Sequence, residues 1–156
     1  MVDKKHIGKQ GEPTKVRIKA ASVSDFAQGV GEMDPVYHDI EAAKKAGYPN
    51  IIAPPTYPIA FMMESMNADM FFELNLDMIS MVHGSQEFVY HGPIVADADY
   101  EIVGRVADCW EKQGKSGILD FVVMEADAKD MDGKIVYTSR ITIIAKQVDR
   151  SDEKEE

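Results

Sequence analysis

The sequence predicts an α+β fold in which a curved antiparallel sheet wraps around one buried helix. Two observations support this prediction. Residues 58–66 carry apolar side chains on nearly every face of a helix, and such a helix must be enclosed by other elements. From Met78 onward, apolar and polar residues alternate with a period of two, which is typical of strands with one buried face. The later half of the chain can therefore supply the sheet that covers the helix.

Three elements are expected before the buried helix. Their ends carry the residue types that commonly begin and stop helices, a Ser or Asp at the start and a Gly at the end. The expected elements are a strand over residues 15–20, a helix that Ser22 begins and Gly31 stops, and a helix over residues 40–46 that Asp39 begins and Gly47 stops. Thr56 is expected to begin the buried helix itself, in which Pro58 is tolerated in the first turn.

Four strands are expected after the buried helix. Asp132-Gly133 is a strong signal for a hairpin turn, and residues 114–117 supply a second turn. The expected strands cover residues 86–90, 99–110, 117–128 and 134–146. In sequence order they would form a four-strand antiparallel meander. A long antiparallel sheet curled around one apolar helix is the hot-dog fold.

Chain length and composition indicate a single globular domain. With 156 residues the chain can bury a sizeable core. We expect a flexible arm over residues 1–13, the hot-dog domain over residues 14–147 and a disordered acidic tail over residues 148–156.

Charge and cysteine usage limit the partners and the compartment. The chain has 17 Lys and Arg against 27 Asp and Glu, a net charge of −10. That charge argues against a nucleic-acid partner, which needs a basic patch, and against electrostatic attraction to an anionic membrane. The N-terminus has no signal-peptide pattern, and a single cysteine, Cys109, excludes an internal disulfide. We therefore expect a cytoplasmic protein, with Cys109 in the core or an interface.

Residues 31–39 concentrate more potential chemistry than any other stretch. They read Gly-Glu-Met-Asp-Pro-Val-Tyr-His-Asp. This resembles the Gly-Asp-x-Asn-Pro-x-His-x-Asp signature of the MaoC-like hydratases and dehydratases. Ala-Gly-Tyr-Pro at residues 46–49, Ala-Pro-Pro-Thr at residues 53–56 and His-Gly-x-Gln-x-Phe-x-Tyr-His at residues 83–91 resemble the N-terminal MaoC-type dehydratase domain. The resemblance covers residues 14–146 and implies the hot-dog fold.

The resemblance also implies a reaction of fatty acid metabolism. Its members are hydro-lyases that add water reversibly to a 2-enoyl thioester of coenzyme A or acyl carrier protein, giving the (R)-3-hydroxyacyl product without a cofactor. An Asp and a His hold the water, and a carboxylate–imidazole pair suits proton transfer near neutral pH. Backbone N–H groups at the start of the central helix polarise the thioester oxygen. In this chain the corresponding residues are Glu32 and His38 for catalysis and Thr56 and Tyr57 for the oxyanion.

The chain departs from the active pattern in three places. Glu32 replaces an Asp, and Tyr37 is an extra residue that sets Glu32 and His38 six positions apart. Residues 53–56 replace the usual His-Gly-Met entry to the helix, and a proline there has no N–H to offer. Similar subunits in the family pair with a second hot-dog chain that carries the catalytic Asp and His, and mainly shape the acyl pocket.

Each candidate residue also has a structural interpretation. Glu32 can be a solvated carboxylate, and His38 a loop histidine bound to the backbone. His83 and His91 can be structural, and four histidines without ligand spacing indicate no metal site. The Met residues near position 62 can fill the core or line an acyl tunnel. The candidate substrate-binding residues are Asp34, Tyr37, Pro54, Pro55, Met62 and His83.

The sequence leaves several functions open. The first is a hydratase or dehydratase, or the acyl-pocket subunit of such an enzyme. The alternatives are a hot-dog acyl-CoA thioesterase and a non-catalytic acyl-binding subunit that needs a catalytic partner. In each case we expect a homodimer, or a heterodimer with a second hot-dog chain, because one curved sheet leaves edge strands to be paired.

Overall fold

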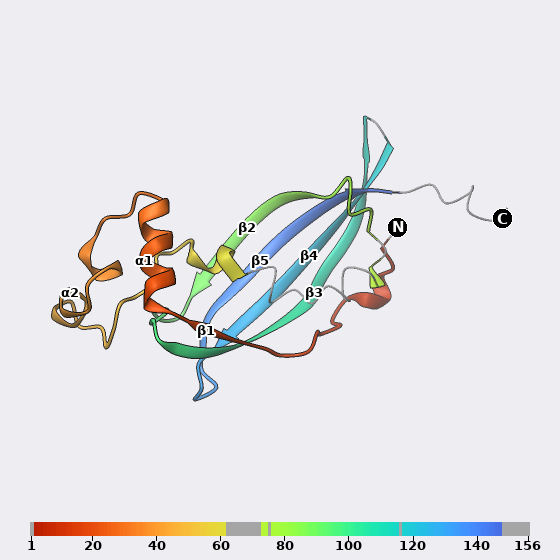
Figure 1. Cartoon of the computed structure of the whole chain (residues 1–156). Helices are drawn as coiled ribbons and strands as arrows, with labels where there is room; N and C mark the ends of the chain where they lie inside the picture. The colour runs from red at the N-terminus through yellow and green to blue at the C-terminus, as the bar shows by residue number, and fades with distance from the viewer. Residues whose placement is uncertain (1, 62–72, 75, 116, 148–156) are drawn as a thin grey trace, which may run out of the picture.

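A five-stranded antiparallel sheet forms the body of the molecule (Figure 1). The computed structural model describes residues 2–61, 73–74, 76–115 and 117–147. The strands are β1 (Thr14–Ile18), β2 (Val82–Tyr90), β3 (Ala98–Gly114), β4 (Gly117–Lys129) and β5 (Ile135–Lys146). Their order across the sheet is β1-β3-β4-β5-β2. This antiparallel sheet with few helices confirms the predicted α+β class.

The predicted four-strand meander is wrong for its first strand. β3, β4 and β5 follow one another as hairpins, but β2 pairs with β5 and not with β3. The amides of His91 and Gly92 both donate to the carbonyl oxygen of Val136, at 2.8 and 3.2 Å, so the chain leaving β2 stays beside the start of β5. Pro93 follows with no N–H for a ladder. The chain then crosses to the far side of the sheet, where β3 begins next to β1.

Within the described residues, five short helices accompany the sheet. They are η1 (Lys4–His6), α1 (Ala20–Gly29), η2 (Pro35–Tyr37), α2 (Ile40–Lys45) and η3 (Tyr57–Phe61). Asp39 begins α2 as predicted, since its carboxylate accepts from the N–H of Ala42 at 2.7 Å. The predicted start of α1 is wrong. The helix begins at Ala20, before Ser22, and the N–H of Ala20 donates to the carboxylate of Asp97 at 3.2 Å.

Asp97 joins three segments that are distant in the sequence. Its φ of 58° lies in the left-handed region, which is uncommon for a residue with a side chain. Its N–H donates to the carbonyl oxygen of Ile18 at 2.6 Å, at the end of β1. Its second carboxylate oxygen accepts from the side-chain amide of Asn50 at 3.3 Å. One aspartate thus fixes the end of β1, the start of α1 and the loop after α2.

The predicted central helix begins as η3. Tyr57 and Pro58 are buried, but Ile59 is 37% exposed and Ala60 is also exposed, so burial on every face is wrong for these two residues. The side chain of Phe61 and residues 62–66, including Met62, lie outside the described residues. In the described ranges, no helix has the length and apolar character needed to cross a bilayer.

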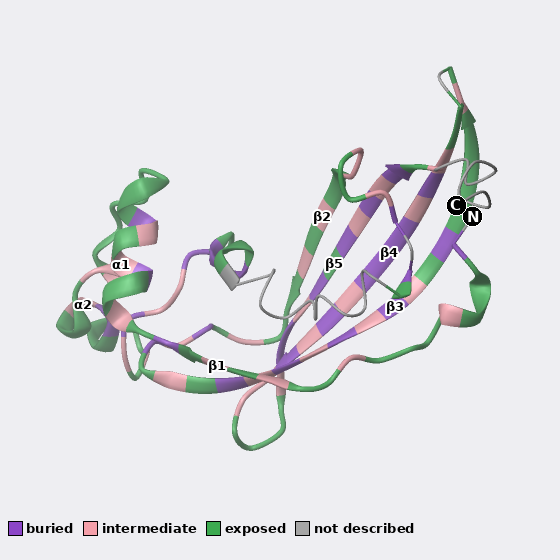
Figure 2. Ribbon diagram, turned by 45° about the vertical axis from the view of Figure 1, so that its right-hand side comes forward, coloured by how far each residue is buried: buried purple, intermediate pink, exposed green. Residues whose placement is uncertain are grey.

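Two clusters of buried side chains form the core, and buried and exposed residues alternate along the strands (Figure 2). The cluster toward the β3–β4 turn contains Val2, Leu74, Leu76, Val106, Cys109, Val122, Met124, Ile141, Ile143 and Ala145. The cluster beneath α1 contains Ile18, Val23, Ile51, Tyr57, Ile94, Ala96, Tyr100, Ile102, Ala126, Ala128, Val136 and Tyr137. The burial of Cys109 agrees with the prediction of a core cysteine.

The segment expected to be a flexible arm runs along the edge of β3. The N–H of Gly8 donates to the carbonyl oxygen of Val106 at 2.8 Å, and the N–H of Val106 donates to that of Lys9 at 3.0 Å. Val2 is buried in the first core cluster. Since β1 pairs with the beginning of β3, the two segments together cover much of this edge.

An ion-pair network crosses the face of the sheet that points away from the core. Arg105 on β3 contacts Glu125 at 2.6 Å and Asp127 at 2.7 Å, both on β4. Arg140 on β5 contacts Glu125 at 3.0 Å. Burial by itself raises the pKa of Asp127, but hydrogen bonds from Arg105 and Thr138 outweigh it and hold the pKa below its usual value.

Candidate functional site

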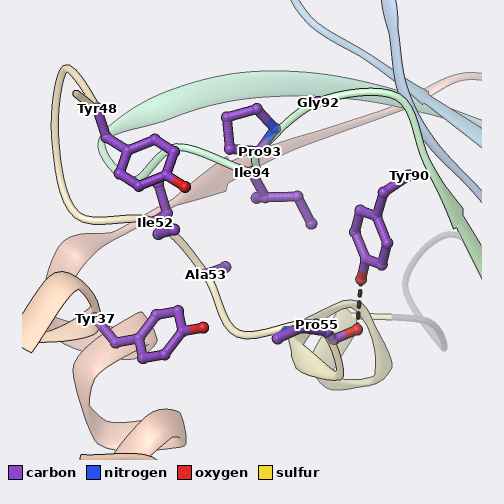
Figure 3. Close-up of a pocket in the computed structure, with 9 residues that line it drawn as sticks. All are labelled: Tyr37, Tyr48, Ile52, Ala53, Pro55, Tyr90, Gly92, Pro93 and Ile94. Atoms are coloured by element: carbon purple, nitrogen blue, oxygen red, sulfur yellow. Dashed lines mark hydrogen bonds between the residues drawn. The ribbon is translucent and has the colours of Figure 1, made fainter. Parts of the chain in front are cut away.

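A pocket lies where the loop after α2 meets the end of β2 (Figure 3). Its cavity volume is about 280 Å³. The lining combines three tyrosines with small and apolar residues from three separate segments. The lining residues are Tyr37, Tyr48, Ile52, Ala53, Pro55, Tyr90, Gly92, Pro93 and Ile94.

Backbone hydrogen bonds hold the loop that forms the pocket floor. The N–H of Ile52 donates to the carbonyl oxygen of Val36 at 3.3 Å, which ties the loop to η2. The N–H of Ala53 donates to the carbonyl oxygen of Ile94 at 2.8 Å, which ties it to the connection between β2 and β3. These two backbone donors are satisfied within the chain, so neither is free to bind a ligand in the pocket.

The pocket presents phenolic hydroxyl groups. Figure 3 shows Tyr37 and Tyr48 on one side of the pocket with both hydroxyls pointing into it, while the hydroxyl of Tyr90 on the opposite side donates to the carbonyl oxygen of Pro55. Burial raises the pKa of Tyr37, and the carboxylate of Glu32 raises it further. Burial also raises the pKa of Tyr90 to about 12. Both phenols therefore remain protonated at neutral pH, and Tyr37 can donate a hydrogen bond to a ligand.

The structure engages both ring nitrogens of His38 within the chain. Nε2 lies 2.8 Å from the carbonyl oxygen of Glu32, and Nδ1 lies 2.8 Å from the hydroxyl of Ser24 on α1. A carbonyl only accepts, so Nε2 donates to the Glu32 carbonyl, while Nδ1 shares its hydrogen bond with the Ser24 hydroxyl. This geometry matches the interpretation of a loop histidine bound to the backbone. The catalytic role stays a prediction.

His38 contacts the backbone carbonyl of Glu32 and not its side-chain carboxylate. That carboxylate is exposed and accepts from the N–H of Asp34 at 3.3 Å. Asp34, a predicted substrate-binding residue, in turn accepts from the N–H of Val36 at 3.1 Å and begins η2. No water-binding pair of carboxylate and imidazole is thus formed by Glu32 and His38 in this arrangement.

The predicted oxyanion donors differ in availability. The N–H of Tyr57 already donates to the carbonyl oxygen of Pro54 at 2.9 Å, and its ring is buried edge-on against Phe26. Thr56 is exposed at the same turn. Neither residue is among those that line the pocket.

The pocket contains some predicted residues and lacks others. Tyr37 and Pro55 line it, whereas Pro54 is buried nearby without lining it. His83 is exposed on β2, roughly 23 Å along the strand from Tyr90 at about 3.3 Å per residue. Met62 lies outside the described residues.

Sequence reasoning missed most of the pocket lining. Tyr48, Ala53 and Tyr90 stand inside the motifs that carry the family resemblance, and that was the available signal. Gly92 and Pro93, which follow the end of β2 at Tyr90, also line the pocket.

Comparison with known proteins adds a family. A family model described as "FAS1-like, dehydratase domain region" matches residues 5–139. A "UPF0336 protein" from Saccharopolyspora erythraea is 33% identical over 147 residues, covering 93% of this chain and 92% of that protein.

Solved structures show the same fold. One is the truncated HadBC complex, a 3R-hydroxyacyl-ACP dehydratase from Mycobacterium tuberculosis, with a TM-score of 0.75, 23% identity and coverage of 90% of this chain and 97% of that one. Another is named "MaoC-like dehydratase", with a TM-score of 0.80, 22% identity and coverage of 92% of this chain and 43% of that one. These similarities confirm the predicted hot-dog fold.

Proposed function

The chain belongs to the MaoC-like hot-dog dehydratase family, and from this premise we propose that it is the acyl-pocket subunit of a hydratase or dehydratase. The substrate would be a 2-enoyl or (R)-3-hydroxyacyl thioester of coenzyme A or acyl carrier protein. A second hot-dog chain would supply the catalytic Asp and His. The observation that carries the proposal is that both ring nitrogens of His38 are engaged within the chain.

The reaction requires a water molecule held between a carboxylate and an imidazole. In this chain Ser24 and the Glu32 carbonyl occupy the two nitrogens of His38, so neither is left to bind or deprotonate water. The Glu32 carboxylate is turned toward the backbone of Asp34. The proton transfers are therefore assigned to the partner chain.

The chemistry of the pocket favours a neutral acyl group. Ile52, Ala53 and Ile94 supply apolar surface, and the protonated hydroxyl of Tyr37 can donate to a thioester carbonyl. The carboxylates that raise the pKa of Tyr37 would repel a free fatty acid, whose own carboxylate is negative at neutral pH. The pocket thus suits a thioester better than its hydrolysis product.

The sheet topology supports a paired assembly. β2 is an edge strand of the sheet and ends at Tyr90, in the pocket wall. Adding a partner's strand to this edge would satisfy its open backbone groups and place the partner beside the pocket. The similarity to the HadBC complex supports pairing with a second hot-dog chain.

The test is an activity assay on the chain alone and on its complex with a co-expressed hot-dog partner that has an intact Asp and His. We expect no loss of enoyl absorbance with the chain alone and turnover with the complex. Tyr37→Phe should raise the KM of the complex several-fold. Tyr48→Phe, which removes a second hydroxyl from the same pocket, is the matched variant for comparison. Release of free thiol would instead identify a thioesterase, and separation of the co-expressed pair into monomers at micromolar concentration would contradict the paired assembly.

A second candidate is a hydratase that works through its own His38. The observation that favours it is the contact between the imidazole and the backbone of Glu32, because rotation of the Glu32 side chain could bring its carboxylate beside the ring. A positioned imidazole contributes about 10²–10⁴ in rate. In this case His38→Ala should abolish turnover of an enoyl-CoA, and Glu32→Gln should only reduce it. Full activity of His38→Ala, alone and with the partner, would exclude this candidate.

A further inference from the structure

The face of the sheet opposite the core carries a row of apolar side chains across four strands. In register, Trp110 on β3 pairs with Phe121 on β4, Phe121 pairs with Ile144 on β5, and Ile144 pairs with Val82 on β2. We call these four residues the outer row. Their strand neighbours, such as Val122, are buried in the core, so the outer row points away from it.

The outer row is accessible. Trp110 is 41% exposed and Val82 is 55% exposed. The rings of Trp110 and Phe121 stack at 5.1 Å between centroids, with 14° between their planes, and form a flat surface. An exposed apolar strip with a stacked tryptophan at one end is typical of a binding surface.

Opposite charges flank the outer row along β3. Two positions beyond Trp110 toward the β3–β4 turn lies Lys112, and two positions before it lies Asp108. Both side chains are exposed and on the same face as Trp110. One side of the row is therefore positive and the other negative on this strand.

The register with β4 and β5 shows which charges lie on each side of the outer row. In register, Lys112 continues through Leu119 on β4 to Lys146 on β5, so two lysines lie on the side of the turn. Asp108 continues through Val123 to Thr142. The outer row thus lies between a positive row and a row that carries one carboxylate.

From this pattern we propose that a second copy of this chain docks back to back on the outer row, with a two-fold axis parallel to the row. Such an axis places Trp110 near its own counterpart. It brings Lys112 of each copy opposite Asp108 of the other, so one ion pair forms twice. Two sheets packed face to face lie about 10 Å apart, a gap that a lysine and an aspartate can span together.

Charge favours this arrangement and this occupant over the alternatives. An axis parallel to the strands would place the two positive rows against each other. An anionic membrane or an acidic carrier would match only the positive side. A second copy matches both sides, because the two-fold rotation exchanges them.

The expected association is reversible. The outer row and its flanks offer far fewer residues than the 20–30 per side that are typical of a stable interface. The proposal does not depend on the proposed function, because the outer row lies on a face of the sheet and the expected partner strand adds to its edge. Pairs joined through β2 could associate further through the outer row.

The test is sedimentation velocity over a range of protein concentrations. We expect the mass of the wild-type species to double as concentration rises, and Trp110→Lys to remove this doubling. Because Trp110 is the single tryptophan of the chain, its emission should also shift to shorter wavelength in the wild type as the assembly forms.

Charge exchange gives the decisive comparison. Asp108→Lys and Lys112→Asp should each weaken association about tenfold, since each replaces two attractions by two repulsions. The double variant Asp108→Lys/Lys112→Asp should restore it, and Lys134→Asp in the exposed β4–β5 turn should leave it unchanged. Circular dichroism checks the fold of each variant, and Lys112→Asp alters only an exposed side chain.

Three results would overturn the proposal. The first is a wild-type mass that does not change with concentration. The second is a folded double variant that associates as weakly as the single variants. The third is a Trp110→Lys chain that loses a co-expressed hot-dog partner, because the outer row would then bind that other chain.

Discussion

Replacing His38 by Ala should destabilise the fold by an amount that follows from its two hydrogen bonds. The imidazole connects Ser24 on α1 to the carbonyl of Glu32 in the loop that follows, at 2.8 Å on each side. A hydrogen bond of this kind contributes about 0.5–1.5 kcal/mol, so His38→Ala should lower the free energy of unfolding by about 1–3 kcal/mol. The imidazole is half-buried, which places the loss within this range.

Urea unfolding, followed by circular dichroism, measures this loss. Ser24→Ala is the matched variant, because it removes one of the two bonds and should cost about half as much. In the His38→Ala background, Ser24→Ala should cost little more, since its partner is already absent. In a thermal scan, each 1 kcal/mol should appear as a shift of about 2–4 °C for a chain of this size.

Additive losses would refute the reasoning. If the double variant equals the sum of the single variants within about 0.5 kcal/mol, Ser24 and His38 do not interact in the folded protein. Nδ1 of the imidazole would then be free for water, and the case for a catalytic His38 would gain strength. Loss of stability with activity retained in the complex would support the acyl-pocket subunit.

Three other perturbations test separate parts of the structure. The charge and hydrogen bonds of Arg105 hold the pKa of Asp127 below 3.8. The ionised Asp127 carboxylate therefore stabilises the fold above pH 3.8, and this stability is lost as the pH falls through the lower pKa of the folded state. Asp127→Asn should remove that part of the acid dependence of urea unfolding. Burial raises the pKa of the Cys109 thiol, so a thiol reagent should label it slowly at neutral pH until urea unfolds the chain. Asp39→Ala removes the first hydrogen bond of α2 and should cost about 1 kcal/mol in thermal unfolding, whereas Asp39→Asn should cost less.

Features that depend on neighbouring residues could be predicted from the sequence. The start of α2 follows from Asp39 and the N–H three residues later. The β4–β5 hairpin follows from Asp132-Gly133, where Gly133 adopts a φ of 80°. Alternation of apolar residues located β3, β4 and β5, because each strand buries one face against the core.

Features that depend on residues distant in the sequence could not be predicted. The start of α1 is set by Asp97, which lies 77 positions after Ala20. The pairing of β2 with β5 depends on where the chain turns after His91, and the alternation of apolar residues does not specify it. The hydrogen bond of His38 to Ser24 and the pocket itself arise only when separate segments meet. Family motifs supplied candidates for the site, but their hydrogen-bond partners required the structure.

The order of strands in the sheet also has a consequence for how the chain folds. The central strands β3, β4 and β5 are consecutive in sequence and joined by two tight turns, so they can pair with little loss of loop entropy. Both edge strands come from earlier in the chain, and Thr14 meets its partner Ile102 across most of the sequence. During synthesis, β1 and β2 therefore cannot pair until their partner strands β3 and β5 have been made. We expect the central hairpins to form first and the two edges to be added last, so substitutions in β1 should chiefly speed unfolding while those at the β4–β5 turn slow folding.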